Sequence, residues 1–121
     1  MTLKEYQQQV MTTCLYESKN FSCMMLNLVG EVGEFASKVA KAIRKDKACI
    51  YYNDLQTESG PNAMTLEEVE YLRKKAGDIL WQLSGLCTVM GWGLEDVAQE
   101  NLDKLASRQA RNKIDGNGDN R

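Results

Sequence analysis

Residues 22–44 read SCMMLNLVGEVGEFASKVAKAIR, and this stretch decides the fold of the 121-residue chain. Its apolar residues recur three and four positions apart, which is the spacing of one face of an α-helix, and they cover about half of the helix circumference. These residues are Met25, Val29, Val32, Ala36, Val39 and Ile43. Because one small chain rarely buries so wide a stripe, the stretch predicts a long helix that also packs against a second copy, in a dimer or tetramer.

Three further segments show the same helical periodicity. Thr2 and Thr65 each stand three residues before a glutamate, which is the capping-box pattern that begins a helix. The sequence GWG at residues 91–93 interrupts the last of the long periodic runs. The expected helices cover about residues 2–18, 22–44, 65–90 and 94–105. Four amphipathic helices in one short chain predict an all-α fold that resembles a four-helix bundle.

The segments outside these helices are polar. Residues 46–64 form a connection rich in Asn, Asp, Ser and Gly that contains the only proline, and no segment shows the alternation expected of a strand. The last seven residues, DGNGDNR, lack apolar side chains. We therefore expect one helical domain over residues 1–114 and a flexible tail over residues 115–121.

Composition excludes several classes of protein. The net charge is -2, which argues against stable nucleic-acid binding, and no apolar run approaches the ~20 residues that span a membrane. The N-terminus does not read as a signal peptide. Four cysteines without a C-x-x-C pair indicate buried free thiols in a reducing cytoplasm. The chain has no histidine, so a bound metal should be a hard cation held by carboxylates.

Two acids stand beside the apolar stripe of the long helix: Glu31 lies at the edge of the stripe, and Glu34 lies further out. They are three residues apart, so both carboxylates can meet on one side of the helix. Gly30 and Gly33 precede them and cost about 1 kcal/mol each relative to alanine, which suits a ligand that approaches the backbone closely. Lys38 stands four residues after Glu34, so an ordinary surface ion pair is the alternative.

Polar residues also stand beside the apolar stripes of the last two helices. Asp78 lies just outside the stripe of the third helix, and Lys75 lies nearer to its edge. In the fourth helix Asn101 falls within the stripe, and Lys104 and Arg108 line its margin. Two cations beside a polar residue suit an anion-binding face. Lysine and arginine side chains that cover apolar surface are the alternative.

Four motifs now occur in a fixed order along the chain. They are GEVGE at residues 30–34, AGDILW at 76–81, NLDKLASR at 101–108 and GDNR at 118–121. The set resembles the motifs of the MazG-like all-α nucleotide pyrophosphohydrolases, and the last motif resembles the tail of small, phage-type members. The resemblance implies a helical dimer or tetramer that hydrolyses (deoxy)nucleoside triphosphates to the monophosphate and pyrophosphate. It also makes a phage origin an expectation.

The resemblance implies roles for individual residues. Glu31, Glu34 and Asp78 match the family's ligands for Mg²⁺, which Mn²⁺ can replace; this ion would bridge phosphate oxygens and activate water. Glu34 or Glu31 would orient or deprotonate the attacking water, because the chain has no histidine. The residues that match phosphate-contacting or conserved polar positions are Lys104, Arg108 and Asn101. Arg111 and Arg121 are further candidates for contacts with a neighbouring subunit's phosphates.

Lys75 departs from the family's pattern. Where the family has E-x-x-D, this chain reads KAGD, so a cation replaces the first acid. Three readings follow. In the first, the remaining acids and the triphosphate hold a single Mg²⁺. In the second, the ammonium of Lys75 stands where a second cation would sit. In the third, the chain binds nucleotide without hydrolysing it. A helical interaction module on the same scaffold is the fourth alternative.

Overall fold

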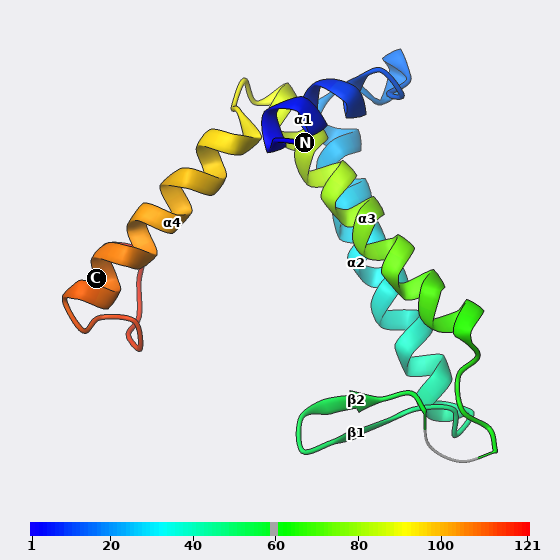
Figure 1. The fold of residues 1–121 in the computed structure, drawn as a ribbon. Helices are drawn as coiled ribbons and strands as arrows, with labels where there is room; N and C mark the ends of the chain where they lie inside the picture. Colours follow the sequence, from blue (N-terminus) through cyan, green and yellow to red (C-terminus); the bar gives the residue numbers. More distant parts are fainter. Residues whose placement is uncertain (59–60) are drawn as a thin grey trace.

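The computed structural model describes residues 1–58 and 61–121, and α-helices carry most of them (Figure 1). The helices are α1 (Leu3–Met11), α2 (Phe21–Arg44), α3 (Leu66–Val89) and α4 (Leu94–Ala110), with a 3₁₀ turn at Tyr16–Ser18. α2 and α3 lie side by side in opposite directions, α1 crosses one end of this pair, and α4 leaves that end as a separate arm (Figure 1). The predicted all-α class is confirmed. Residues 59 and 60 of the connection lie outside the described residues.

Helix α1 is shorter than the periodicity predicts. It ends at Met11, although the apolar spacing continues to about Ser18. The hydroxyls of Thr12 and Thr13 each donate a hydrogen bond to the backbone carbonyl three residues earlier. Such local bonds satisfy the last carbonyls of a helix and compete with its continuation. The threonines therefore end α1 early.

A short β-hairpin stands in the connection, where the sequence predicted no strand. β1 (Cys49–Tyr51) and β2 (Asp54–Gln56) pair antiparallel. The turn residues Tyr52 and Asn53 have positive φ angles of 49° and 68°, as two-residue hairpin turns require. Each strand has three residues, all exposed, so no alternation of buried and exposed positions could reveal it. The hairpin projects away from the end of α2 and α3 (Figure 1).

Two expectations from composition concern the cysteines and the membrane. The four cysteines are free, but only Cys87 is buried, since Cys14 and Cys23 are half-buried and Cys49 lies exposed on the hairpin. The expectation that these thiols are buried is therefore wrong for Cys49. No helix in the described part of the chain is long and apolar enough to cross a membrane.

The contact between α2 and α3 supplies most of the core. Near the hairpin, Phe35 and Val39 of α2 pack against a cluster of buried residues, which are Ala42, Ala48, Met64 and Leu72. Met24 is only 1% exposed, and it lies against Gly85 of α3. Two patches of apolar contact therefore hold the long helices together and set how they lie against each other.

Gly85 lies beneath Met24, and we expect Gly85→Ala to destabilise the protein. An added Cβ would lie 2.7 Å from Cε of Met24, and the buried methionine has little room to withdraw. Urea unfolding should show a loss of about 1–3 kcal/mol, the usual effect of overpacking. In a Met24→Ala background the same change should instead stabilise by roughly 1 kcal/mol, because alanine favours helix over glycine. An equal loss in both backgrounds would contradict this account.

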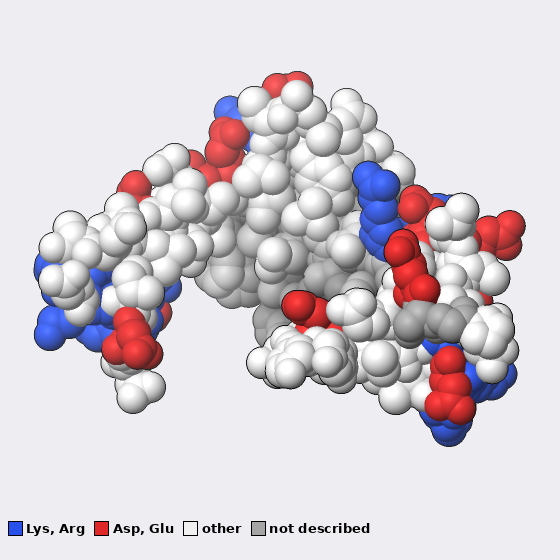
Figure 2. All heavy atoms as spheres, turned by 60° about the horizontal axis from the view of Figure 1, so that its bottom comes forward, with Lys and Arg blue, Asp and Glu red and all other residues white. Residues whose placement is uncertain are grey.

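Large apolar side chains remain exposed on α2, α3 and α4. The α2 stripe that the sequence singled out points largely away from α3, since Val29 and Val32 are 59% and 49% exposed. On α4, Leu102 is 60% exposed. Figure 2 shows a broad area without charged side chains between the arm of α4 and the hairpin end of α2 and α3. α2 is apolar on two faces, and one chain covers only one of them. The uncovered face is where a second copy would pack, and the dimer or tetramer itself stays a prediction.

Candidate active site

Three carboxylates from α2 and α3 meet at the ammonium of Lys75. Nζ of Lys75 lies 3.0 Å from Oε2 of Glu31, 2.6 Å from Oε2 of Glu34 and 3.3 Å from Oδ2 of Asp78. Glu31 and Glu34 are neighbours along α2, and Lys75 and Asp78 are neighbours along α3. Because the two helices lie side by side, the pairs that helical spacing predicted come together around one cation.

Lys75 is largely enclosed by these acids. Its side chain is 16% exposed and that of Glu31 is 21% exposed, whereas Glu34 and Asp78 are about half exposed. Hydrogen bonds to Glu34, and next to Glu31, hold the pKa of Lys75 well above its usual range. One ammonium cannot neutralise three carboxylates, so the cluster keeps two formal negative charges. It can therefore still attract a further cation.

The surface ion pair expected as the alternative for Glu34 does not form. Among residues 1–58 and 61–121, no ion pair joins Glu34 to Lys38, and Glu34 reaches across to α3 instead. The ammonium of Lys38 lies 4.8 Å from the ring centre of Tyr71, which attracts it as a cation–π partner. The aromatic ring thus draws Lys38 away and leaves Glu34 to the cluster.

A small cavity of about 160 Å³ opens beside the acids. It is lined by Glu31, Asp78, Trp81 and Gln82. The side-chain oxygen of Gln82 is buried and has no hydrogen-bond partner in the described part of the chain, which costs about 1–3 kcal/mol for such a group. Sequence reasoning missed Gln82, although its position four residues after Asp78 places both on one side of α3. Gln82 therefore combines a buried, unpartnered oxygen with a place in the wall of this cavity.

The residues around Lys75 suit a hard cation in their chemistry. Carboxylate oxygens are ligands that Mg²⁺ prefers, and Glu31, Glu34 and Asp78 supply only such atoms. Over the described ranges, however, no group of three or more Asp, Glu, His or Cys side chains stands ready to hold a metal ion. The acids converge on a point that the ammonium of Lys75 already occupies. Metal binding by these acids stays a prediction.

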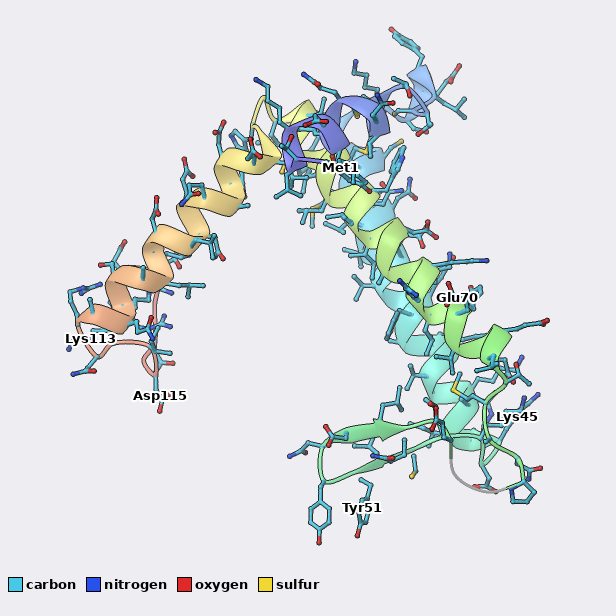
Figure 3. The ribbon with its side chains drawn as sticks, viewed as in Figure 1. Met1, Lys45, Tyr51, Glu70, Lys113 and Asp115 are labelled. Carbon is cyan, nitrogen blue, oxygen red and sulfur yellow. The ribbon has the colours of Figure 1, made fainter. Side chains whose placement is uncertain are left out.

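The predicted phosphate-contacting cations lie apart from the acids. Lys104 and Arg108 belong to the far half of α4, which diverges from α2 and α3 (Figures 1 and 3). Both contact Oδ1 of Asp119 in the tail, at 2.9 Å from Nζ of Lys104 and 3.1 Å from Nη2 of Arg108. These bonds, that of Lys104 first, lower the pKa of the Asp119 carboxyl below its usual range. The pair thus binds an anionic group, which here belongs to the same chain.

The remaining candidates also lie on α4 or in the tail. Asn101 is exposed, because the apolar stripe around it is uncovered in one chain. The guanidinium of Arg111 donates to the carbonyl of Arg121 at 2.7 Å, and Arg121 donates to three backbone carbonyls between residues 113 and 118. The tail therefore lies against the end of α4, where Figure 3 labels Lys113 and Asp115. Whether these arginines contact phosphates stays a prediction.

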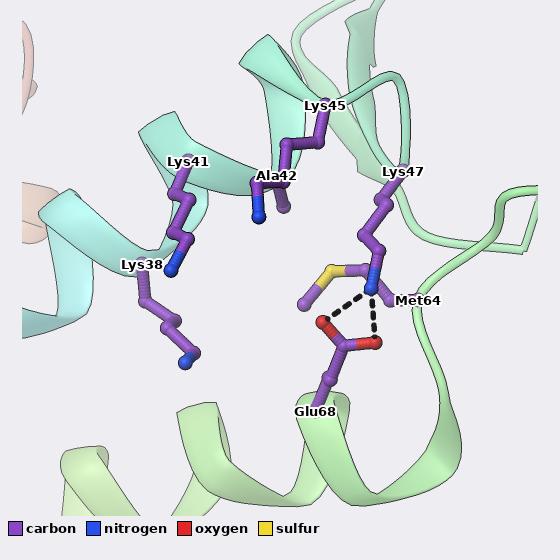
Figure 4. Close-up of a pocket in the computed structure, with 7 residues that line it drawn as sticks. All are labelled: Lys38, Lys41, Ala42, Lys45, Lys47, Met64 and Glu68. Carbon is purple, nitrogen blue, oxygen red and sulfur yellow. Dashed lines mark hydrogen bonds and ion pairs between the residues drawn. The ribbon is translucent and has the colours of Figure 1, made fainter.

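A second cavity, at the hairpin end of α2, is lined mainly by lysines (Figure 4). Its charged lining residues are Lys38, Lys41, Lys45, Lys47 and Glu68. Lys47 donates to both carboxylate oxygens of Glu68, at 2.8 and 3.0 Å, and this contact lowers the pKa of Glu68 to about 2. The ion pair ties the chain after α2 to the first turn of α3. Cations at the end of α2 also complement its helix dipole, so this cavity has a structural explanation.

Comparison with known proteins agrees with the motifs. A family model described as "MazG nucleotide pyrophosphohydrolase domain" matches residues 19–111. The "Gene 37 protein" of Mycobacterium phage L5 is 35% identical over 103 residues, which are 85% of this chain and 78% of the relative. No solved structure matches significantly. The family match includes the three acids, Lys75 and both cations of α4, whereas the GDNR tail lies beyond it.

Proposed function

This chain belongs to the MazG nucleotide pyrophosphohydrolase family, and on that premise we propose that it hydrolyses a (deoxy)nucleoside triphosphate, with Mg²⁺, to the monophosphate and pyrophosphate. The observation that carries the proposal is the convergence of Glu31, Glu34 and Asp78 on one cation position beside a cavity. We place the reaction in the cytoplasm, where its substrates are, and include a phage origin because the relative is a phage protein.

The three acids would divide the work of binding and catalysis. Glu31, Glu34 and Asp78 would hold Mg²⁺, or Mn²⁺ in its place, through carboxylate oxygens. When bound, the ion polarises phosphoryl oxygens and acidifies water. Glu34 is the most exposed of the three, at 57%, so it is the best placed to orient the attacking water and accept its proton. Glu31 is more enclosed. It would either share the activation of the water or hold the ammonium of Lys75, which also contacts Glu34, in position. Water then cleaves the bond between the α and β phosphates, and pyrophosphate leaves.

A second copy of the chain would complete the site. Within one chain, Lys104 and Arg108 are carried away from the acids by the arm of α4 (Figure 1). The exposed apolar faces of α2 and α4 would become buried if two chains packed together. We therefore propose a homodimer or homotetramer in which the cations of one copy offset the phosphate charge held at the acids of another. Asn101, Arg111 and Arg121 would lie at the same junction.

A nucleotide-binding protein without hydrolysis is the second candidate. The observation that favours it is the ammonium of Lys75 at the point where the acids converge. A cation at that point competes with a metal ion for the same oxygens. The triphosphate could still bind through the cations of α4, while the attacking water would lack activation.

A pyrophosphate-release assay tests the proposed function. Purified protein should release pyrophosphate from at least one canonical or modified nucleotide, in a manner that requires Mg²⁺ or Mn²⁺ and stops with EDTA. Light scattering in parallel should report a dimer or tetramer. Absence of release from every nucleotide, by protein shown to be folded, would overturn the enzyme proposal. Calorimetry with a non-hydrolysable dNTP would then separate a silent binder, which binds it with Mg²⁺, from an interaction module, which does not.

A further inference from the structure

We propose that the ammonium of Lys75 is a built-in cation that takes the place of a resident divalent metal ion among Glu31, Glu34 and Asp78. Three carboxylates so close to one point repel each other strongly unless a positive charge lies between them. In this chain the positive charge comes from α3 itself. The site should therefore hold its acids in place without any resident metal.

The geometry differs from that of an ordinary surface ion pair. An ammonium has three N–H donors, and Nζ of Lys75 has three carboxylate partners within 3.3 Å. Lys47 provides the contrast within the same protein, since it pairs with a single acid, Glu68, and its side chain is 34% exposed. Lys75 is 16% exposed, and its partners come from two different helices. A lysine so placed acts on the whole acid cluster rather than on one neighbour.

A metal ion that binds the acids without nucleotide differs from one that arrives bound to the substrate. Lys75 leaves two formal negative charges on the cluster, and its contacts use one oxygen of each acid. A Mg²⁺ ion bound to a triphosphate already has phosphate oxygens among its ligands and needs few from the protein, whereas an ion without nucleotide needs several carboxylate oxygens and has to compete with Lys75 for them. The inference rests on the proposed function only in taking these acids as the metal-binding group.

Thermal unfolding without nucleotide tests this inference. Wild-type protein should melt at the same temperature in EDTA and in Mg²⁺ or Mn²⁺. Lys75→Met, which keeps the length of the side chain and removes its charge, should melt roughly 10 °C lower in EDTA, because three acids are left unpaired. Added Mg²⁺ or Mn²⁺ should restore most of that loss, since a metal that binds only the folded state stabilises it.

Matched variants and direct metal binding make the test specific. Lys74→Met changes the exposed neighbour on α3, which has no ion pair among the described residues, and should behave like wild type. Lys75→Arg keeps the charge and should leave unfolding insensitive to metal. The electron paramagnetic resonance signal of free Mn²⁺ should fall on addition of Lys75→Met but hardly change with wild type.

The outcomes that would overturn the inference do not depend on activity. One is a wild-type protein that Mn²⁺ or Mg²⁺ stabilises as strongly as it stabilises Lys75→Met. Another is a Lys75→Met protein that melts like Lys74→Met whether or not metal is present. If Lys75→Met does not fold in EDTA, folding on addition of either metal supports the inference, and failure to fold with both contradicts it. Failure of pyrophosphate release with these metal effects intact would sink the proposed function alone.

Discussion

Glu34→Gln is expected to reduce pyrophosphate release by about 10²–10⁴-fold, which is the usual contribution of a general base. Glutamine keeps the size of the side chain but cannot accept the proton of the attacking water. It also removes one of the three negative charges that meet at Lys75, so the attraction for Mg²⁺ falls as well. We expect the loss in kcat, with a smaller rise in the Mg²⁺ concentration needed for half-maximal activity.

The control for this variant is Glu70→Gln. Glu70 also lies on a long helix, and its side chain is 51% exposed, close to the exposure of Glu34, but its ion-pair partner is Arg73 at 4.0 Å. Glu70→Gln should keep wild-type activity within a factor of about two. If Glu34→Gln instead kept more than about a tenth of the activity, the role assigned to it would be wrong. The same measurement on Glu31→Gln would then show whether Glu31 serves as the base.

Local rules predicted the helices and the pairing of the acids. The predicted capping box between Thr65 and Glu68 is present in the structure. The Thr65 hydroxyl accepts a hydrogen bond from the backbone N–H of Glu68, and the Glu68 carboxylate accepts one from the backbone N–H of Thr65. These bonds join residues three apart, which a sequence pattern records directly. Glu31 and Glu34, and likewise Lys75 and Asp78, are also three residues apart, so the sequence predicted that each pair lies on one side of its helix. The family and the all-α class followed from such patterns.

The meeting of the two pairs could not be predicted in the same way. It depends on which turn of α2 lies against which turn of α3, and buried contacts far from the acids, such as Met24 on Gly85, set that alignment. The sequence therefore left three readings of Lys75, and the observed contacts favour the one in which its ammonium stands among the acids. No helical spacing contains information about a contact 44 residues apart in the chain.

The direction of α4 and the contacts of the tail were also beyond the sequence. The periodicity of α4 indicates a helix with one apolar face, but not what covers that face, and within one chain Leu102 and Leu105 stay exposed. Nothing in the GDNR motif indicates that Asp119 contacts Lys104 and Arg108. Both features depend on long-range packing, and in our proposal the first also depends on a second copy, which one sequence cannot place.

Two inactive variants are expected to restore activity when they are combined in one oligomer. Lys104→Gln should lose about 10²-fold in activity, because it removes a cation from the phosphates. Lys104 lies half-exposed on α4, so this change should leave the chain folded. If the cations of one copy serve the acids of another, a hetero-oligomer of Lys104→Gln and Glu34→Gln contains one site with both defects and one site with neither.

The two variants are co-expressed so that their chains assemble at random, and all dimers are purified together. Such a preparation should recover about a quarter of wild-type activity, since half of the dimers are mixed and half of the sites in a mixed dimer are intact. This is a large rise over either variant alone. Co-expression of Glu34→Gln with Glu31→Gln is the control and should recover nothing, because every shared site keeps one damaged acid on its own helix. A mixture of Lys104→Gln and Glu34→Gln that shows only the summed activity of its components would mean that acids and cations do not meet across copies. The arm of α4 would then have to fold back onto its own α2 and α3 to reach the substrate.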